Sequence, residues 1–274
     1  MIKKLKKYYE ELIQKPILTS FIVLGLLTIL IIGLSLRFYL TDFDNIYMNV
    51  LAEAHGMLFD ILIIGILIYW LREIGEEKQR VRQYIDEIDD FRMWESEEAA
   101  FRNVGNIKRL NRHHINNIEL VGCYLKKTNL NGVNLQGSNL NTADLSNAIL
   151  IEANLSETRM NQTNFENANL NHALLKGTYA SGSNFKDAFM IKADLQDAFL
   201  IKADFQNGFL MEANLSNCSL AECNFENANL YKANFTGATG LTVEQLAKAK
   251  SLYLATFDPD IKVLLEERIP DLIG

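Results

Sequence analysis

The chain has 274 residues, of which 49% are hydrophobic and 22% are charged, and its net charge at pH 7 is −7. Its three cysteines exclude a disulfide framework, and the acidic balance has the wrong sign for general binding to nucleic acid. This length fits one large domain or two domains of modest size.

Two apolar segments occupy the first seventy residues. Residues 17–36 contain no charged side chain, and a helix of that length is about 30 Å long, the thickness of a bilayer core. Residues 56–71 carry one charge, Asp60. The pattern predicts a two-helix transmembrane hairpin over residues 1–71, with a buried core helix as the alternative for the second segment. A carboxyl group inside a bilayer is costly, so Asp60 is a candidate functional residue unless it lies at the interface or is protonated.

Basic residues are concentrated on the two outer sides of this hairpin. Five lysines lie in residues 1–16 and four basic residues in 72–82, whereas the connection 37–55 contains Arg37 alone. Basic residues close to membrane spans stay in the cytoplasm. We therefore expect an integral protein of a bacterial inner membrane, with the lipid bilayer as a partner and both termini in the cytoplasm.

Residues 72–115 are expected to form a helical connector. Ile74, Val81 and Ile88 repeat every seven residues, which fits either a short coiled coil or a helix that packs on its own chain. Ser96 is a candidate N-cap for a second helix that ends near Arg112.

Residues 116–240 repeat every five residues without a change of register. From Leu120 to Phe235, every fifth residue is Leu, Phe, Met or, once, Ala, and the residue two positions earlier is small in nearly every copy. The residue just before each large one is usually Asn or Asp. A period of five is neither helical nor that of a strand, so it suits a chain that turns a corner in every pentad and stacks its coils.

These pentads resemble the pentapeptide-repeat family, whose motif is A-(D/N)-(L/F)-x-x. The segments ADLSN (143–147), ANLSE (153–157), ADLQD (193–197) and ANFTG (233–237) match it. The resemblance implies an all-β, right-handed quadrilateral β-solenoid with four pentads in each of about six coils. Independently, Phe recurs every twenty residues at 165, 185, 205 and 225, which predicts one internal stack of rings.

Residues 241–274 leave the repeat and are expected to form a helical cap. Thr242 and Gln245 make a capping-box pair that opens a helix over TVEQLAKAKSL, and a second short helix is expected after Pro259. A solenoid end exposes strand edges and core, so it needs such a cap.

One outer wall of the solenoid is expected to be apolar. With four pentads per coil, one wall carries seven large apolar residues: Ile149, Ile151, Phe189, Ile191, Phe209, Met211 and Tyr231. The opposite wall carries Tyr179, Phe199 and Ile201. A wall of this kind predicts an interface with a protein partner or a second copy, and the alternative is that the chain's own helices cover it.

The sequence contains no recognisable catalytic, cofactor or metal site. Cys123, Cys218 and Cys223 fall on the small inward position, where filling the core is the expected role. We therefore expect a membrane-anchored scaffold that is not an enzyme and takes no cofactor or metal. One alternative is an oligomeric, channel-like protein that perturbs the membrane. Another, which the resemblance implies, is a DNA mimic that binds gyrase, although lysines interrupt any acidic strip and nucleic acid is not an expected partner.

Overall fold

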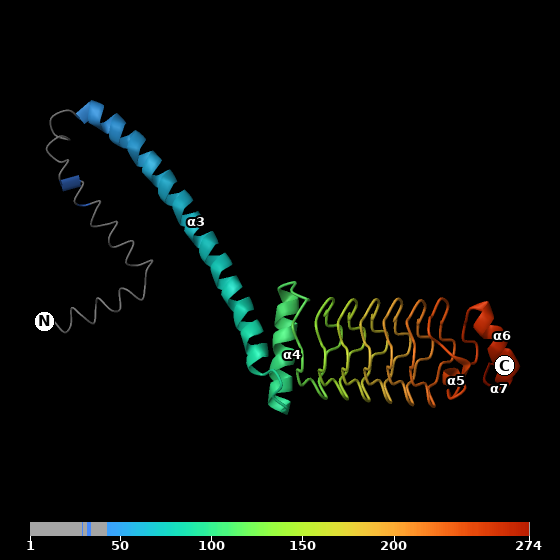
Figure 1. Ribbon diagram of the computed structural model, residues 1–274. Coiled ribbons are helices and arrows are strands. Elements are labelled where there is room, and N and C mark those ends of the chain that lie inside the picture. The colour runs from blue at the N-terminus through green and yellow to red at the C-terminus, as the bar shows by residue number, and fades with distance from the viewer. Residues whose placement is uncertain (1–28, 30–31, 34–42, 274) are drawn as a thin grey trace. The chain divides into compact units, whose positions relative to one another are not determined.

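Figure 1 shows the computed structural model of the chain, in which residues 29, 32–33 and 43–273 are described. The chain divides into two compact units, Met1–Gly75 and Glu76–Gly274. The named helices are α3 (Phe43–Asp90), α4 (Glu97–Arg112), α5 (Val243–Leu246), α6 (Pro259–Arg268) and α7 (Pro270–Ile273).

The second apolar segment lies inside α3, a continuous helix of 48 residues. Its side chains from Ile61 to Leu71 are all exposed. The first segment, 17–36, lies outside the described residues except for positions 29, 32 and 33. Among the described residues, no helix combines the length and apolar character that crossing a membrane requires. The structure thus does not support the predicted span at 56–71: sixteen residues of helix extend about 24 Å, less than a bilayer core of about 30 Å.

Helix α4 closes the amino-terminal end of the solenoid. Ser96 is its N-cap, as predicted, because the Ser96 hydroxyl accepts a hydrogen bond from the Ala99 N–H at 3.1 Å. Ile107 and Leu110 of α4 and Ile88 of α3 are buried in one continuous core with the first coils. The connector helix therefore packs on its own chain, which was one of the two arrangements predicted for it.

A single side chain supplies the backbone partner that the first coil lacks. The Asn111 amide donates to the Asn134 carbonyl at 2.7 Å, and its oxygen accepts from the Asn134 N–H at 2.8 Å. A preceding coil would offer these same two hydrogen bonds. Asn111 thus protects an edge that would otherwise be free to pair with another chain.

The pentads form the predicted quadrilateral solenoid. Parallel bridges join residues twenty apart, from Glu119–Asn139 at one end to Ser219–Thr239 at the other. Every large central residue from Leu120 to Phe235 is at most 1% exposed. Four pentads therefore make one coil, and Figure 1 shows these coils stacked side by side between α4 and the carboxy-terminal helices.

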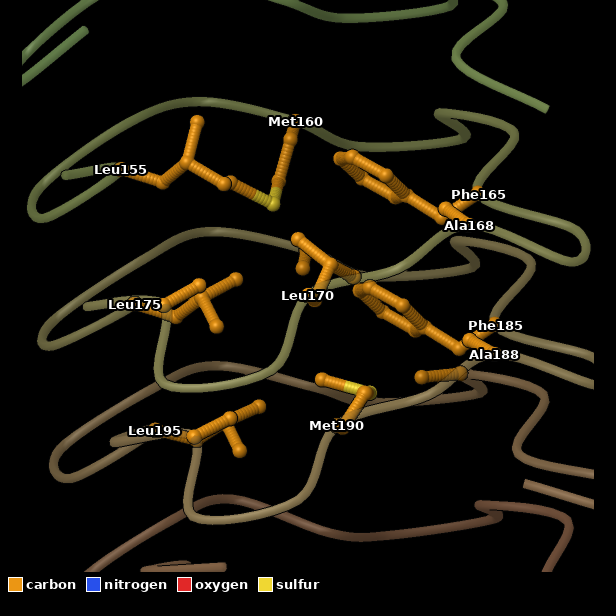
Figure 2. Close-up of a cluster of buried hydrophobic side chains, with 14 of the residues drawn as sticks. Leu155, Met160, Phe165, Ala168, Leu170, Leu175, Phe185, Ala188, Met190 and Leu195 are labelled. Atoms are coloured by element: carbon orange, nitrogen blue, oxygen red, sulfur yellow. The ribbon is translucent and has the colours of Figure 1, made fainter. Parts of the chain in front are cut away.

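The expected internal column of rings is also confirmed. Phe165, Phe185, Phe205 and Phe225 are fully buried, with successive centroids 5.0, 5.1 and 5.4 Å apart and ring planes within 7° of parallel. Figure 2 shows the rings of Phe165 and Phe185 one above the other, beside the Leu and Met side chains of the neighbouring walls. Stacked rings and aliphatic side chains leave the interior closely packed.

Each corner of the solenoid holds one residue in the left-handed region. The second residue after every centre, from Gly122 to Gly237, has a φ between 55° and 75°. Only six of these 24 positions are Gly, and the others include Glu and Lys, as at Glu152 and Lys202. Left-handed backbone costs such residues about 1–2 kcal/mol each, so the stacked coils must stabilise the turn.

The carboxy-terminal cap continues the stacking for part of another coil. The capping box of Thr242 and Gln245 is present, and α6 follows at Pro259 as predicted. However, α5 ends at Leu246 rather than near Leu252, because the next residues form bridges such as Asn229–Ser251 and Asn234–Thr256. These bridges are 22 residues apart, so α5 adds two residues to the coil without ending it.

Candidate interaction surface

Most bridged positions, just before each centre, carry Asn or Asp, and several of these side chains form hydrogen-bonded ladders. In one wall, the Asn164 amide donates to Asp144 at 3.2 Å, and the Asn184 amide donates to Asn164 at 3.0 Å. The same oxygens accept a backbone N–H two residues ahead, as Asn164 does from Glu166 at 3.1 Å. Asn or Asp is therefore favoured before a centre because its side chain closes a turn and links neighbouring coils.

One wall interrupts this ladder with two phenylalanines. Its bridged positions run, coil by coil, from Asn129 through Ile149, Asn169, Phe189 and Phe209 to Asn229. The rings of Phe189 and Phe209 stack with centroids 4.9 Å apart and planes 3° from parallel. Phe189 is 40% exposed with the whole chain present, so no described helix covers it.

Three further side chains extend this pair. Ile191 and Met211 follow Phe189 and Phe209 at the first turn position of the same coils, and Tyr231 takes that position in the next coil. All three are partly buried. We call these five residues the aromatic patch: Phe189, Ile191, Phe209, Met211 and Tyr231.

The seven residues predicted from the sequence do not form one continuous surface. Ile149, which is 39% exposed, and Ile151 are separated from the aromatic patch by the coil that carries Asn169 and Asn171. The Asn171 oxygen accepts a hydrogen bond from the Ile191 N–H at 2.8 Å, so this coil is part of the polar ladder. The predicted wall is thus a patch of five residues and a distinct pair.

The structure also adds a residue that the pentad count missed. Tyr253 packs on Tyr231 with centroids 6.0 Å apart. The two residues inserted at α5 move Tyr253 out of the five-residue phase. The sequence shows Tyr253 as an aromatic residue after the repeat, but the five-residue period does not predict its place beside Tyr231.

Charged side chains line one edge of the aromatic patch. The Lys192 ammonium group lies 3.6 Å from a carboxylate oxygen of Glu212, and the Lys232 ammonium group lies 5.2 Å from the centre of the Tyr231 ring. Exposed ion pairs of this kind contribute little to stability. They place polar groups at the edge of an apolar surface, as protein–protein interfaces do.

The opposite wall has a smaller aromatic pair. Tyr179 and Phe199 stack with centroids 5.0 Å apart, and Ile201 lies next to them in the first turn position. Tyr179 is 47% exposed. This pair therefore provides a matched control for experiments on the aromatic patch.

The cysteines lie where the sequence places them, on the small inward positions. All three are buried, and burial raises the pKa of Cys218 and Cys223 to about 12 and that of Cys123 to about 11. The Cys218 thiol donates to the Leu195 carbonyl at 2.9 Å. Within the described part of the chain, no three His, Cys, Asp or Glu side chains are grouped as metal ligands.

Asp60, the candidate within the second apolar segment, is exposed on α3. Its neighbours Phe59 and Ile61 are exposed as well. The other candidate residues that the structure describes are on the solenoid, so Asp60 does not form a site with them.

Comparison with known proteins identifies the repeat. Residues 116–207 and 210–239 match the family description "Pentapeptide repeats", in eight copies. This part of the chain is therefore similar to pentapeptide-repeat proteins. No curated protein sequence matches the chain significantly.

Several solved structures resemble part of the chain. QnrB1, a plasmid-mediated fluoroquinolone resistance protein, is 16% identical, with a TM-score of 0.37 over 56% of this chain and 85% of QnrB1. A pentapeptide repeat protein from the thylakoid lumen of Arabidopsis thaliana is 24% identical, with a TM-score of 0.25 over 52% and 77% of the two chains. HetL from Nostoc, involved in the regulation of heterocyst differentiation, is 25% identical, with a TM-score of 0.17 over 56% and 79%.

Proposed function

We propose that this chain is a non-catalytic interaction protein that is held at a membrane and binds protein through its aromatic patch. The stacked pair of Phe189 and Phe209 carries the proposal. The partner is either another protein or a second copy of the chain, and the solenoid is the rigid support that presents the patch.

The fold itself does not require phenylalanine at these two positions. Asn169 and Asn229 occupy equivalent places in the same column, and each accepts a hydrogen bond from the backbone two residues ahead, at 3.2 Å. The two phenylalanines together give up two such hydrogen bonds, worth about 2 kcal/mol, and regain about 0.5–1.5 kcal/mol from the one ring pair that they form. The exchange therefore does not stabilise the fold, and it exposes an apolar surface, which a binding role explains.

The test replaces both rings by the residue that the ladder prefers. A Phe189→Asn, Phe209→Asn variant should keep the fold, since Asn is native at neighbouring coils, but should lose binding. The matched control is Tyr179→Asn, Phe199→Asn on the opposite wall. Light scattering on a sizing column measures self-association of residues 76–274, and chemical crosslinking of the full chain in its host membrane measures other partners. If the double Asn variant keeps the wild-type mass and every crosslinked partner, the proposal is wrong.

The membrane part of the proposal has two supports. One is the uncharged sequence 17–36, and the other is the exposed apolar surface of α3 up to Leu71. Exposure of so many apolar side chains to water is unfavourable, so we propose that lipid covers this surface. Because basic residues flank both segments, we propose that they enter a bacterial inner membrane from the cytoplasmic side and leave the solenoid in the cytoplasm. Vesicle flotation tests the attachment, and protease accessibility of the solenoid tests its side of the membrane. Digestion of the solenoid by protease added only outside the cell would contradict the cytoplasmic location.

A second candidate function is a protein that perturbs the membrane on clustering. The exposed carboxyl group of Asp60 among the apolar side chains of α3 favours it. Induced expression should then lower the membrane potential, and Asp60→Asn should prevent this. An unchanged membrane potential would exclude the candidate.

We do not propose the DNA mimic. Lys176, Lys186, Lys192 and Lys202 project from the solenoid, and each lies 3.4–3.9 Å from an acidic side chain of the following coil. Such pairs break up the continuous negative surface that imitation of a duplex requires. Inhibition of gyrase supercoiling by residues 76–274 would revive this alternative.

A further inference from the structure

The outward side of α4 carries the most exposed large apolar residue in the described part of the chain. Phe101 is 81% exposed, whereas Ala100, Val104 and Ile107 on the inward side are buried. Along the outward side, Phe101 is followed at helical spacing by Gly105 and Lys108. The core does not use Phe101, so this ring is open to a partner outside the core.

Basic side chains surround Phe101 on both sides. A cleft of about 390 Å³ between α4 and the first coil is lined by Phe101 together with Lys108, Lys126 and Lys127. A second cleft, of about 660 Å³, is lined by Phe101 with Arg80, Arg102 and Arg109. Six basic and three acidic side chains line the two clefts, a net charge of +3 in a chain whose total is −7.

The lysines of this region are available for a partner. Arg102 already pairs with Glu87 at 3.1 Å and Glu98 at 3.0 Å. In contrast, Lys108, Lys126 and Lys127 form no ion pair with any described residue. We call Phe101 and these three lysines the basic–aromatic surface.

We infer that the basic–aromatic surface binds the headgroups of an anionic phospholipid bilayer. An aromatic ring that enters the headgroup region and lysines that meet lipid phosphates are the two elements of peripheral membrane binding. Protein interfaces, by comparison, are depleted of lysine, so three lysines around one exposed ring favour lipid over protein.

This inference rests on the proposed membrane attachment. Phe101 follows Leu71, the last residue of the apolar part of α3, by thirty residues in the chain. Attachment of the chain through α3 would make contact between this surface and the bilayer an intramolecular event, so a weak contact suffices. Each lysine near an anionic surface contributes about fivefold to binding. Burying the ring of Phe101 adds a further factor of about 10 to 100.

The test uses the full chain in vesicles and a fluorescent probe one turn from Phe101. Glu97→Cys provides the labelling site, and Asn167→Cys, an exposed position in the middle of the solenoid, is the matched control. All three native cysteines are buried, so an environment-sensitive dye such as NBD labels only the new thiol. Vesicles of phosphatidylcholine alone are compared with vesicles that contain 30% phosphatidylglycerol.

We expect the probe at position 97 to shift to the blue and to be quenched by nitroxide lipids only in anionic vesicles. Phe101→Ser and Lys126→Gln, Lys127→Gln should each reduce the bound fraction at least tenfold, and 0.5 M salt should weaken it as well. The inference is wrong if position 97 behaves like position 167, or if the shift is equal in neutral vesicles. A shift that appears in detergent micelles and disappears on dilution would assign the surface to a second copy.

Flotation of the same vesicles separates this inference from the attachment proposal. A chain that floats with neutral vesicles but shows no lipid contact at position 97 refutes the basic–aromatic surface alone. A chain that does not float with any vesicle refutes the membrane attachment itself.

Discussion

Removal of one ring from the internal Phe column tests whether aromatic stacking stabilises the solenoid beyond simple burial. Phe205 stacks on Phe185 at 5.1 Å and on Phe225 at 5.4 Å, and it is fully buried. Phe205→Leu removes two ring pairs at about 0.5–1.5 kcal/mol each, and the change of shape costs about another 1 kcal/mol. We expect a total loss of about 2–4 kcal/mol in the free energy of unfolding.

Phe165→Leu in the same column is the matched comparison. Phe165 stacks only on Phe185, at 5.0 Å, and the position below it in the column is Leu145. Phe165→Leu should therefore lower the free energy of unfolding by less than Phe205→Leu does. The difference is one ring pair, about 0.5–1.5 kcal/mol. Urea unfolding of residues 76–274, which form a compact unit, measures both changes by circular dichroism. Equal losses in the two variants would show that burial alone accounts for the column.

Three further predictions concern the turns, the amino-terminal edge and the thiols. Glu152 has a φ of 58°, so Glu152→Gly should raise stability by about 1 kcal/mol in urea unfolding, whereas Glu152→Ala should not. Asn111→Ala removes both hydrogen bonds to Asn134 and should cost about 2–3 kcal/mol, and hydrogen exchange at the Asn134 amide should accelerate more than exchange at Asn214. Because burial raises the pKa of Cys218 and Cys223 from 9.0 to about 12, the unfolded chain loses these protons first, and stability should fall as pH rises from 9 to 12. A Cys218→Ala, Cys223→Ala variant should show a flatter decline in the same titration.

The repeat could be predicted from the sequence because its signal is redundant. Nearly all of the twenty-four pentads place one large and one small residue inward, so the period of five follows from spacing. The twenty-residue spacing of Phe predicts the ring column and supports the coil of four pentads that the family resemblance implies. The N-cap at Ser96 and the capping box at Thr242 also follow from local sequence, since their hydrogen bonds span three residues.

Other features depend on contacts that local sequence does not contain. Glu and Lys are poor candidates for left-handed backbone, yet the coil above and below each corner holds them there. Asn111 protects the first coil through Asn134, 23 residues away, so nothing near Asn111 in the sequence marks its role. The helix after Thr242 has a helical composition, but pairing with the last coil ends it after Leu246.

We take the outward residues of the solenoid that depart from what the fold prefers as the candidates for a binding role. At a bridged outward position, Asn satisfies the turn and the ladder, so a large apolar residue there calls for another explanation. Phe189 and Phe209 depart in this way, as do Ile149 and the control pair Tyr179 and Phe199. Phe101 is a separate case, an exposed apolar residue on the outward side of helix α4.

The aromatic patch and the basic–aromatic surface are separate enough to act independently. Lys127 lies at the corner before Leu130, and Phe189 precedes Met190 on the same wall, three coils further on. At about 4.8 Å per coil, the two surfaces are about 14 Å apart along the solenoid. Effects of mutations at sites more than 7–10 Å apart usually add, so the Phe189→Asn, Phe209→Asn change should leave lipid contact at position 97 intact. Two independent surfaces would allow the protein to contact lipid and a protein partner at the same time. If the Phe189→Asn, Phe209→Asn change abolished both partner binding and lipid contact at position 97, the two surfaces would be a single site.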